Sequence, residues 1–165
     1  REKDLSSREL FTLGQSLRNL TRRYHATLLI NDRIDIALAV DADGVHLTEQ
    51  SLDVPQARQL LGPDRLIGVS THHLDRAREV ERQGADFITF SPIYATPSKA
   101  AYGAPQGLEK LHDVCQQVAL PVIALGGINA QRRPEVMAAG ARGCAVISAI
   151  LAASDPCQAA RELRS

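Results

Sequence analysis

The sequence predicts an α/β protein built on a parallel sheet, and three observations support this fold class. Six short apolar runs recur along the 165 residues, the runs are continuous rather than alternating, and helical segments separate them. Continuous apolar runs are typical of strands buried on both faces. A regular alternation of strand and helix is typical of parallel strands joined by crossover helices.

The expected elements follow one another in a simple order. Strands are predicted at 26–31, 44–47, 66–70, 87–91, 121–125 and 144–148. Helices are predicted at 7–24, 54–61, 74–83, 108–118 and 133–139, where apolar residues recur at three- and four-residue spacing. The sequence Ala-Asp-Gly or a near relative precedes three of the strands, as in Ala42-Asp43-Gly44, and this repeat is interpreted as architectural.

Six strands do not close a (β/α)8 barrel, the TIM barrel, which needs eight. The chain opens on a polar stub, "REKD", followed at once by a long helical segment, as if a strand came before it. We therefore expect one TIM-barrel domain over residues 1–165, with the first one or two strands missing from this chain. An open doubly wound sheet is the alternative, but no GxGxxG or Walker loop marks its ligand site.

Composition excludes several classes of partner. With 19 basic and 19 acidic residues the formal charge is zero, so no broad electric field would attract nucleic acid or an anionic membrane. No apolar run is long enough to span a bilayer. Three cysteines without metal-ligand spacing, Cys115, Cys144 and Cys157, are expected to be inert small hydrophobes in a reducing compartment, which favours a cytoplasmic location. A homo-oligomer is compatible with this composition.

Polar residues that follow the strands are the candidate site, because the reactive face of a parallel barrel lies at the strand C-termini. Gly126-Gly127 and Ile147-Ser148 follow the last two expected strands, where such barrels bind phosphate through backbone N–H groups and a helix N-terminus. Ser148 is expected both to cap that helix and to bind the phosphate. A tight turn and an ordinary helix cap are the structural alternative.

Other strand ends offer charge and acid–base groups. Asp32 directly follows a strand and could bind Mg²⁺ at a phosphate, or merely cap the next helix. Arg1 and Lys3 alternate along an extended stub and could face the same polyanion. The three histidines near strands, His46, His72 and His73, lack an evident carboxylate partner and are interpreted as mainly structural.

Several motifs together resemble one family. The segments, in order, are "REKD", "LLINDR", "ADGVHL", "IGVSTH", "GADFITFSPIYATPSK", "PVIALGGI" and "AVISAI". They resemble the superfamily of thiamine phosphate synthase and the TenI-type thiazole tautomerase. In the synthase, hydroxymethylpyrimidine diphosphate loses pyrophosphate and the resulting carbocation is captured by the nitrogen of thiazole phosphate.

The resemblance implies a role for each candidate residue. Phosphorylated pyrimidine and thiazole molecules would be the substrates and Mg²⁺ the cofactor. Arg1, Lys3 and Asn31 would hold the pyrimidine diphosphate, with Asn31, Ser70 and Lys99 at the reacting group and Asp32 on Mg²⁺. Thr96, Ser98, Gly127, Ile147 and Ser148 would bind the thiazole phosphate. The long loop after the strand at 87–91 would thus be a substrate lid.

Two departures from the family patterns bear on the activity. The second Mg²⁺-binding Asp of the synthase falls at Ser51, where Glu49 or Asp53 could substitute, and this favours the TenI side. The His of the tautomerase falls at Pro92, which cannot shuttle a proton, and this favours the synthase. A synthase-type transferase is the leading hypothesis. A thiazole tautomerase, or a non-catalytic binder of thiazole phosphate, is the alternative.

Overall fold

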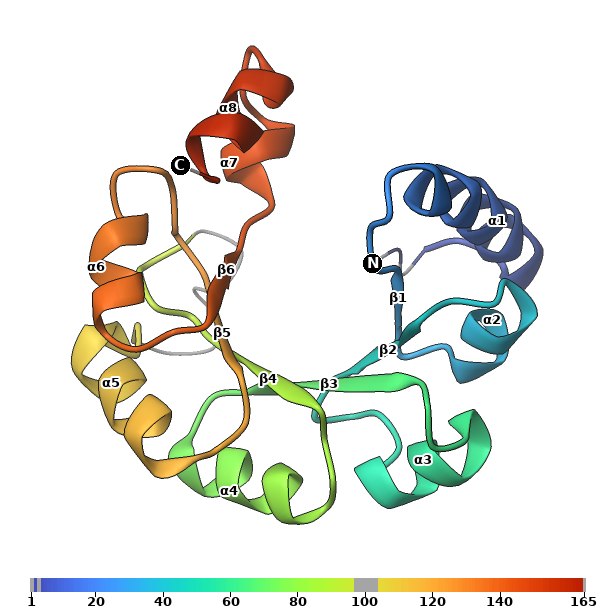
Figure 1. The fold of residues 1–165 in the computed structure, drawn as a ribbon, viewed down its shortest axis with the longest axis horizontal. Coiled ribbons are helices and arrows are strands. Elements are labelled where there is room, and N and C mark those ends of the chain that lie inside the picture. Colours follow the sequence, from blue (N-terminus) through green and yellow to red (C-terminus); the bar gives the residue numbers. More distant parts are fainter. Residues whose placement is uncertain (1, 3, 97–103, 165) are drawn as a thin grey trace. The chain divides into compact units, whose positions relative to one another are not determined.

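The computed structural model of this chain describes residues 2, 4–96 and 104–164. The chain forms two compact units. Figure 1 labels their helices and strands. Unit 1 comprises the described residues up to Ser70 together with Arg82–Asp86, and unit 2 comprises Thr71–Glu81 and the described residues from Phe87 onward. Every strand pair within the units is parallel, which confirms the α/β class with parallel strands. The single TIM-barrel domain stays a prediction.

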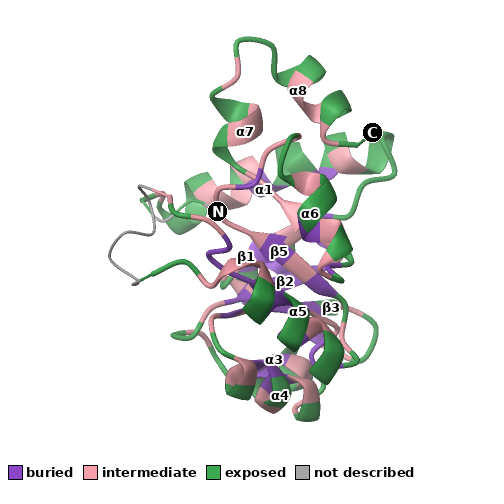
Figure 2. Cartoon of the chain, turned by 90° about the vertical axis from the view of Figure 1, so that its left-hand side faces the viewer, coloured by how far each residue is buried: buried purple, intermediate pink, exposed green. Residues whose placement is uncertain are grey.

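Unit 1 carries three parallel strands and three helices. They are α1 (Ser7–Arg23), β1 (Leu29–Asn31), α2 (Ile34–Ala39), β2 (Gly44–Leu47), α3 (Val54–Leu61) and β3 (Leu66–Thr71) up to Ser70. In the sheet, Ile30 pairs with Val45, and Val45 pairs with Ile67. All three side chains are buried, and Figure 2 shows buried residues on the strands while the outer helix faces are exposed. This burial explains why the strand sequences are continuously apolar.

Helix α1 begins and packs for identifiable reasons. Ser6 and Glu9 form a capping box, in which each side chain accepts a hydrogen bond from the other residue's backbone N–H. Gly14 faces α2, and a Cβ built on it would lie 3.1 Å from Cγ1 of Val40. A glycine at this position therefore lets the two helices approach closely.

The repeated turn before the strands is a hydrogen-bonding device. Before β2, Asp43 Oδ2 accepts hydrogen bonds from Leu28 N at 2.7 Å and from Arg18 Nη1 at 2.6 Å. Before β4, Asp86 Oδ2 accepts from Ile67 N at 2.7 Å and from Arg58 Nη2 at 2.7 Å. Each carboxylate thus ties the preceding strand to the helix that comes before that strand, α1 for Asp43 and α3 for Asp86, which confirms that the repeat is architectural.

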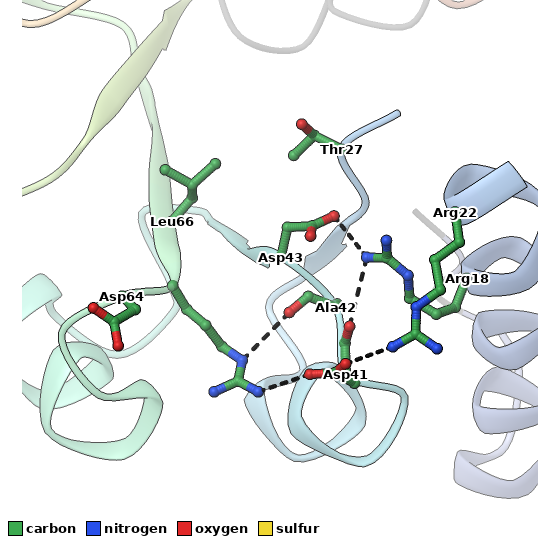
Figure 3. A pocket seen from close by; sticks show the side chains of 9 residues that line it. Arg18, Arg22, Thr27, Asp41, Ala42, Asp43, Asp64 and Leu66 are labelled. Carbon is green, nitrogen blue, oxygen red and sulfur yellow. Dashed lines mark hydrogen bonds and ion pairs between the residues drawn. The ribbon is translucent and has the colours of Figure 1, made fainter. Parts of the chain in front are cut away.

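The first of these devices borders a polar cavity of about 590 Å³ at the N-terminal ends of the unit 1 strands (Figure 3). Asp41 there accepts from Arg22 at 2.5 Å and from Arg65 at 3.1 Å. The cavity is lined by Arg18, Arg22, Thr27, Asp41, Ala42, Asp43, Asp64, Arg65 and Leu66. None of the predicted site residues is among them, and these ion pairs hold helix α1 to the strands.

We expect Asp43→Asn to lower the free energy of unfolding by about 1 kcal/mol at pH 7, since a part-exposed, charge-assisted hydrogen bond is lost. Burial acts to raise the pKa of Asp43, but the hydrogen bonds from Leu28 N–H and Arg18 outweigh it and lower that pKa below its usual value. A carboxylate with a depressed pKa stabilises the fold above its unfolded-state pKa and loses this contribution as the pH falls through its folded-state pKa.

Denaturant unfolding between pH 7 and pH 2.5 measures this effect. The difference between wild type and Asp43→Asn should be full near neutrality and should disappear at the acid end. Asp64→Asn is the control, because Asp64 lines the same cavity on an exposed turn. A constant difference across the range would contradict the expectation.

Unit 2 repeats the strand–helix pattern. It contains α4 (Leu74–Arg82) up to Glu81, β4 (Phe87–Phe90), α5 (Gly107–Gln117), β5 (Val122–Leu125), α6 (Arg133–Ala138), β6 (Gly143–Ala145), α7 (Ser148–Leu151) and α8 (Pro156–Glu162). Phe90 pairs with Ala124, and Leu125 pairs with Ala145. Leu111 and Val114 of α5 and Val136 of α6 are buried, so these helices supply the apolar cover of the unit.

Within residues 2, 4–96 and 104–164, every helix is too short or too polar to cross a lipid bilayer. All three cysteines are free. Burial raises the pKa of the Cys115 and Cys144 thiols, as expected for inert side chains. Cys157 differs from the expectation of a packed hydrophobe, because it is exposed at the start of α8.

Candidate functional site

The C-terminal ends of the unit 1 strands bring four of the predicted residues to one edge of the sheet. Asn31 ends β1 and pairs with His46, and Asp32 N donates to His46 O at 3.0 Å. Ser70 follows Val69, the residue that pairs with Leu47 at the end of β2. Ser51 lies four residues beyond Leu47 in the next turn. Side chains from three neighbouring strand ends can therefore act on one ligand in this unit.

Asp32 is the carboxylate at this edge. Its side chain is exposed and its backbone is left-handed, with φ of 64°. Arg33 N donates to Asn31 O at 2.7 Å and Ile34 N donates to Asp32 O at 3.0 Å, so the chain turns tightly before α2. Asp tolerates this conformation better than most residues. The side chain caps no helix, since α2 has no side-chain cap, and it remains available to a cation.

Ser51 is held in a turn with Thr48. Its Oγ accepts a hydrogen bond from Thr48 N at 2.7 Å and lies 3.0 Å from Thr48 Oγ1. No group of three or more His, Cys, Asp or Glu side chains converges within the described residues in a way that could hold a metal. A Mg²⁺ ion needs only one or two protein carboxylates when water and phosphate oxygens complete its shell. Asp32 fits that requirement, and Ser51 supplies no charge.

In unit 2 the turn after β5 is a diglycine with both residues at positive φ, 106° at Gly126 and 67° at Gly127. The segment after β4 lies directly against it. Ile93 N donates to Leu125 O and Tyr94 N donates to Gly126 O, both at 3.0 Å. A Cβ built on Gly127 would lie 2.8 Å from Cβ of Tyr94 and 3.4 Å from Cγ2 of Thr96. Thr96 and Gly127 are thus neighbours, as the predicted phosphate site requires.

The register of β5 and β6 places the other two phosphate-site residues at the same level. Leu125 pairs with Ala145, so Gly127 and Ile147 each lie two residues beyond a pair. Ile147 is 62% exposed and Ser148 is exposed. No described residue accepts a hydrogen bond from the N–H groups of Gly127, Ile147 or Ser148. These unpartnered donors lie at the ends of two adjacent strands, where an anion can bind them.

One expectation for this site is wrong in detail. Ser148 is not the N-cap of the following helix: Ile147 is the cap residue, Ser148 is the first residue of α7, and no side chain caps α7. The reason is that β6 ends at Ala145, two residues before the cap, so the chain has already turned into the helix at Ser148. The Ser148 side chain is consequently free of a capping bond.

Four predicted residues, Arg1, Lys3, Ser98 and Lys99, lie outside the described residues. The base of their loop is described: Gln106 N donates to Pro92 O at 2.7 Å and Gly107 N donates to Ile93 O at 3.1 Å. The loop between β4 and α5 is therefore closed at its base by backbone hydrogen bonds.

The histidines fit a structural role. His72 Nδ1 lies 2.6 Å from Ser91 O and so joins the segments after β3 and β4 within unit 2. His46 lies inside β2, opposite Asn31. His73 is exposed just before α4, and its carbonyl accepts a hydrogen bond from Ala77 N.

Sequence reasoning missed a cluster beside the diglycine turn. Tyr94 OH donates to Glu135 Oε1 at 2.5 Å, and the Arg132 guanidinium lies 4.4 Å from the centroid of the Tyr94 ring. Arg132 Nη1 also donates to Gly127 O at 2.7 Å. The sequence offered only an aromatic residue in a polar loop, with Glu135 41 residues further along the chain, and this is too general a signal to single these residues out.

Comparisons with known proteins agree on one family. The family model for thiamine monophosphate synthase (TMP-TENI) matches residues 1–150. Thiamine-phosphate synthase of Moorella thermoacetica is 49% identical over 99% of this chain and 78% of its own length. The protein of the same name from Chloroflexus aurantiacus is 47% identical over 100% of this chain and 76% of its own length.

A solved structure is also similar. Thiamine phosphate pyrophosphorylase from Pyrococcus furiosus matches with a TM-score of 0.92 and 40% sequence identity, over 99% of this chain and 78% of that one.

Proposed function

The chain belongs to the thiamine monophosphate synthase family, and from this premise we propose that it joins hydroxymethylpyrimidine diphosphate to thiazole phosphate with release of pyrophosphate. The observation that carries the proposal is that 99–100% of this chain matches proteins named thiamine-phosphate synthase, at 47–49% identity. Formation of thiamine phosphate from the two substrates is the experiment that tests it.

We propose that the thiazole phosphate binds at the strand ends of unit 2. The N–H groups of Gly127, Ile147 and Ser148, which have no acceptor among residues 2, 4–96 and 104–164, support this assignment, since backbone donors at adjacent strand ends and at a helix start stabilise a phosphate. Thr96, next to Gly127, would add a hydroxyl from the loop. Ser98 is proposed to act with it.

The pyrimidine diphosphate is proposed to bind at the strand ends of unit 1. Asn31 and Ser70 would contact it there, with the cations of Arg1, Lys3 and Lys99. When the bond to pyrophosphate breaks, negative charge grows on the departing group, so donors and cations directed at it stabilise the transition state more than the ground state. Bound Mg²⁺ would supply further charge stabilisation, with Asp32 as its protein ligand. No general base is required in this step.

The alternative, a TenI-type tautomerase, is less well supported. Tautomerisation needs a group that moves a proton between carbon and nitrogen, and Pro92 stands where the tautomerase has a His. The relatives named above are synthases rather than tautomerases.

Three broader assignments complete the proposal. The six strands are proposed to belong to a (β/α)8 barrel, for which the similarity to the P. furiosus structure is the support. The protein is proposed to act in the cytoplasm on small phosphorylated substrates, without binding nucleic acid or a membrane, in keeping with its biosynthetic family. A homo-oligomer is compatible with it.

We expect Ser51→Asp to tighten Mg²⁺ binding about tenfold or more, which corresponds to about 1.4 kcal/mol. The variant adds a second carboxylate at the edge where Asp32 offers one. An Asp at this position can still accept the hydrogen bond that Thr48 N donates to Ser51, so the turn should persist. Calorimetric titration of Mg²⁺ in the presence of pyrophosphate measures the change, and the rate of Mg²⁺-dependent pyrophosphate release should rise with it.

Leu52→Asp is the matched control, because it adds the same charge one residue away on an exposed side chain. If Ser51→Asp changes neither Mg²⁺ affinity nor rate while the fold is intact, the assignment of Ser51 as the second position is wrong. Glu49→Ala and Asp53→Ala then show whether a neighbouring carboxylate already fills that role.

A further inference from the structure

The segment after β4 fixes the orientation of the diglycine turn. Gly126 O accepts a hydrogen bond from Tyr94 N at 3.0 Å. A peptide group is planar and trans, so its C=O and the N–H of the next residue point in opposite directions. The N–H of Gly127 is therefore directed away from Tyr94 N. It is one of the donors without an acceptor among the described residues.

The next peptide group is fixed as well. Arg132 Nη1 donates to Gly127 O at 2.7 Å, so both carbonyls of the turn are hydrogen-bonded. Neither glycine could be replaced without displacing the segment, since a Cβ on Gly126 would lie 2.8 Å from Cα of Pro92 and one on Gly127 would lie 2.8 Å from Cβ of Tyr94. The N–H of Gly127 is consequently held in one direction before any ligand arrives.

The side chain of Tyr94 locks this arrangement to α6. Its ring lies under the guanidinium of Arg132, and its hydroxyl donates to Glu135 Oε1. A guanidinium is suited to this position because its planar face stacks on the ring while its edge donates to a carbonyl. Burial, and then the hydrogen bond to Glu135, raise the pKa of Tyr94 to about 12, so its hydroxyl keeps its proton at neutral pH.

We propose that Tyr94, Arg132 and Glu135 form a clamp that holds the Gly127 N–H in position to bind the phosphate of the thiazole substrate. The three are positioning residues, because they act through the turn. They contribute to binding of the thiazole substrate and not to binding of the pyrimidine substrate. This inference rests on the proposed function, because it assigns further residues to the same phosphate site.

Arg132→Ala tests the clamp in steady-state kinetics. We expect the KM for thiazole phosphate to rise about tenfold or more, because a displacement on the order of 1 Å in a positioned group can cost up to a hundredfold. The kcat and the KM for the pyrimidine diphosphate should stay within about twofold. Arg132→Lys should not restore the KM, since an ammonium keeps the charge but loses the planar fork. Tyr94→Phe, which loses only the bond to Glu135, should give a smaller rise.

Arg133→Ala is the matched control, because it removes the same charge from the neighbouring residue at the start of α6. It should leave all three parameters near those of wild type. Equal effects of Arg132→Ala and Arg133→Ala, or full rescue by Arg132→Lys, would show that only charge matters and would overturn the clamp.

Two measurements separate the clamp from the proposed function. In a chain with the other two tyrosines, Tyr24 and Tyr102, replaced by Phe, ultraviolet absorbance follows ionisation of Tyr94 alone. Glu135→Gln should lower its midpoint, and an unchanged midpoint contradicts the contact. Inorganic phosphate binding, measured by calorimetry, should weaken in Arg132→Ala and not in Arg133→Ala. If phosphate binding weakens only in Arg132→Ala but the protein makes no thiamine phosphate, the proposed function fails while the clamp stands. If the enzyme is active and both variants bind phosphate equally well, the clamp fails.

Discussion

Ser148→Asp is expected to weaken the binding of thiazole phosphate at least a hundredfold. Ser148 is the first residue of α7, and its N–H has no acceptor within the described part of the chain. An Asp carboxylate at this position would repel the phosphate and compete for the same N–H groups. Two unit charges about 4 Å apart repel by about 4 kcal/mol at an effective dielectric constant of about 20. Every 1.4 kcal/mol or so is a tenfold change in affinity.

Isothermal titration with thiazole phosphate measures this loss. Ser148→Ala should cost no more than about tenfold, because it removes one hydroxyl and keeps the backbone donor. Ser154→Asp is the charge control, since it adds the same carboxylate on an exposed residue between α7 and α8. Wild-type affinity in Ser148→Asp would remove the strand ends of β5 and β6 from the binding site.

We expect Gly44→Ala to lower the free energy of unfolding by about 3 kcal/mol or more, the largest stability effect that we expect from a single methyl group. Gly44 pairs with Leu66 across β2 and β3. A Cβ on Gly44 would collide with the carbonyl oxygen of Leu66 and lie 2.7 Å from its carbonyl carbon. These are backbone atoms, so no side-chain rotation relieves the contact, and the pairing of the two strands must shift.

Gly143→Ala is the matched control for this prediction. Gly143 is the first residue of β6, as Gly44 is of β2, but a Cβ there meets only the end of the Ile123 side chain, at 3.4 Å. Denaturant unfolding should show a change of at most about 1 kcal/mol for this variant. Equal stabilities of the Gly44→Ala and Gly143→Ala proteins would show that the close approach of β2 and β3 is not what the glycine permits.

Local patterns were sufficient for most elements of the fold. Helix α3 and strand β2 have the predicted bounds. For α3 the reason is local, because a Pro stands near its start and a Gly follows its end. The strand expected at 26–31 is shorter, since pairing begins only at Leu29 opposite Gly44. Helix α2 was not predicted: its sequence, "IDIALA", is short and nearly alternating, which resembles a strand more than a helix.

The candidate site was only partly accessible from sequence. The rule that parallel strands present their C-terminal ends together placed Asn31, Asp32, Gly127 and Ile147 at sheet edges, where the structure has them. The clamp was not accessible, because Tyr94 and Glu135 are 41 residues apart and neither lies in a pattern of its own. Contacts of this kind depend on how two loops pack, which periodicity does not encode. The family resemblance was confirmed by the match to the thiamine monophosphate synthase model.

Pyrophosphate release, measured with each substrate alone and with both together, tests the transferase activity most directly. Purified protein in Mg²⁺-containing buffer is expected to release pyrophosphate only when hydroxymethylpyrimidine diphosphate and thiazole phosphate are both present, in an amount equal to the thiamine phosphate formed. Asp32→Asn should reduce this rate strongly. Asp64→Asn should not, because Asp64 lines the cavity at the other end of the unit 1 strands. Conversion of thiazole alone, or no pyrophosphate release with both substrates, would contradict a synthase.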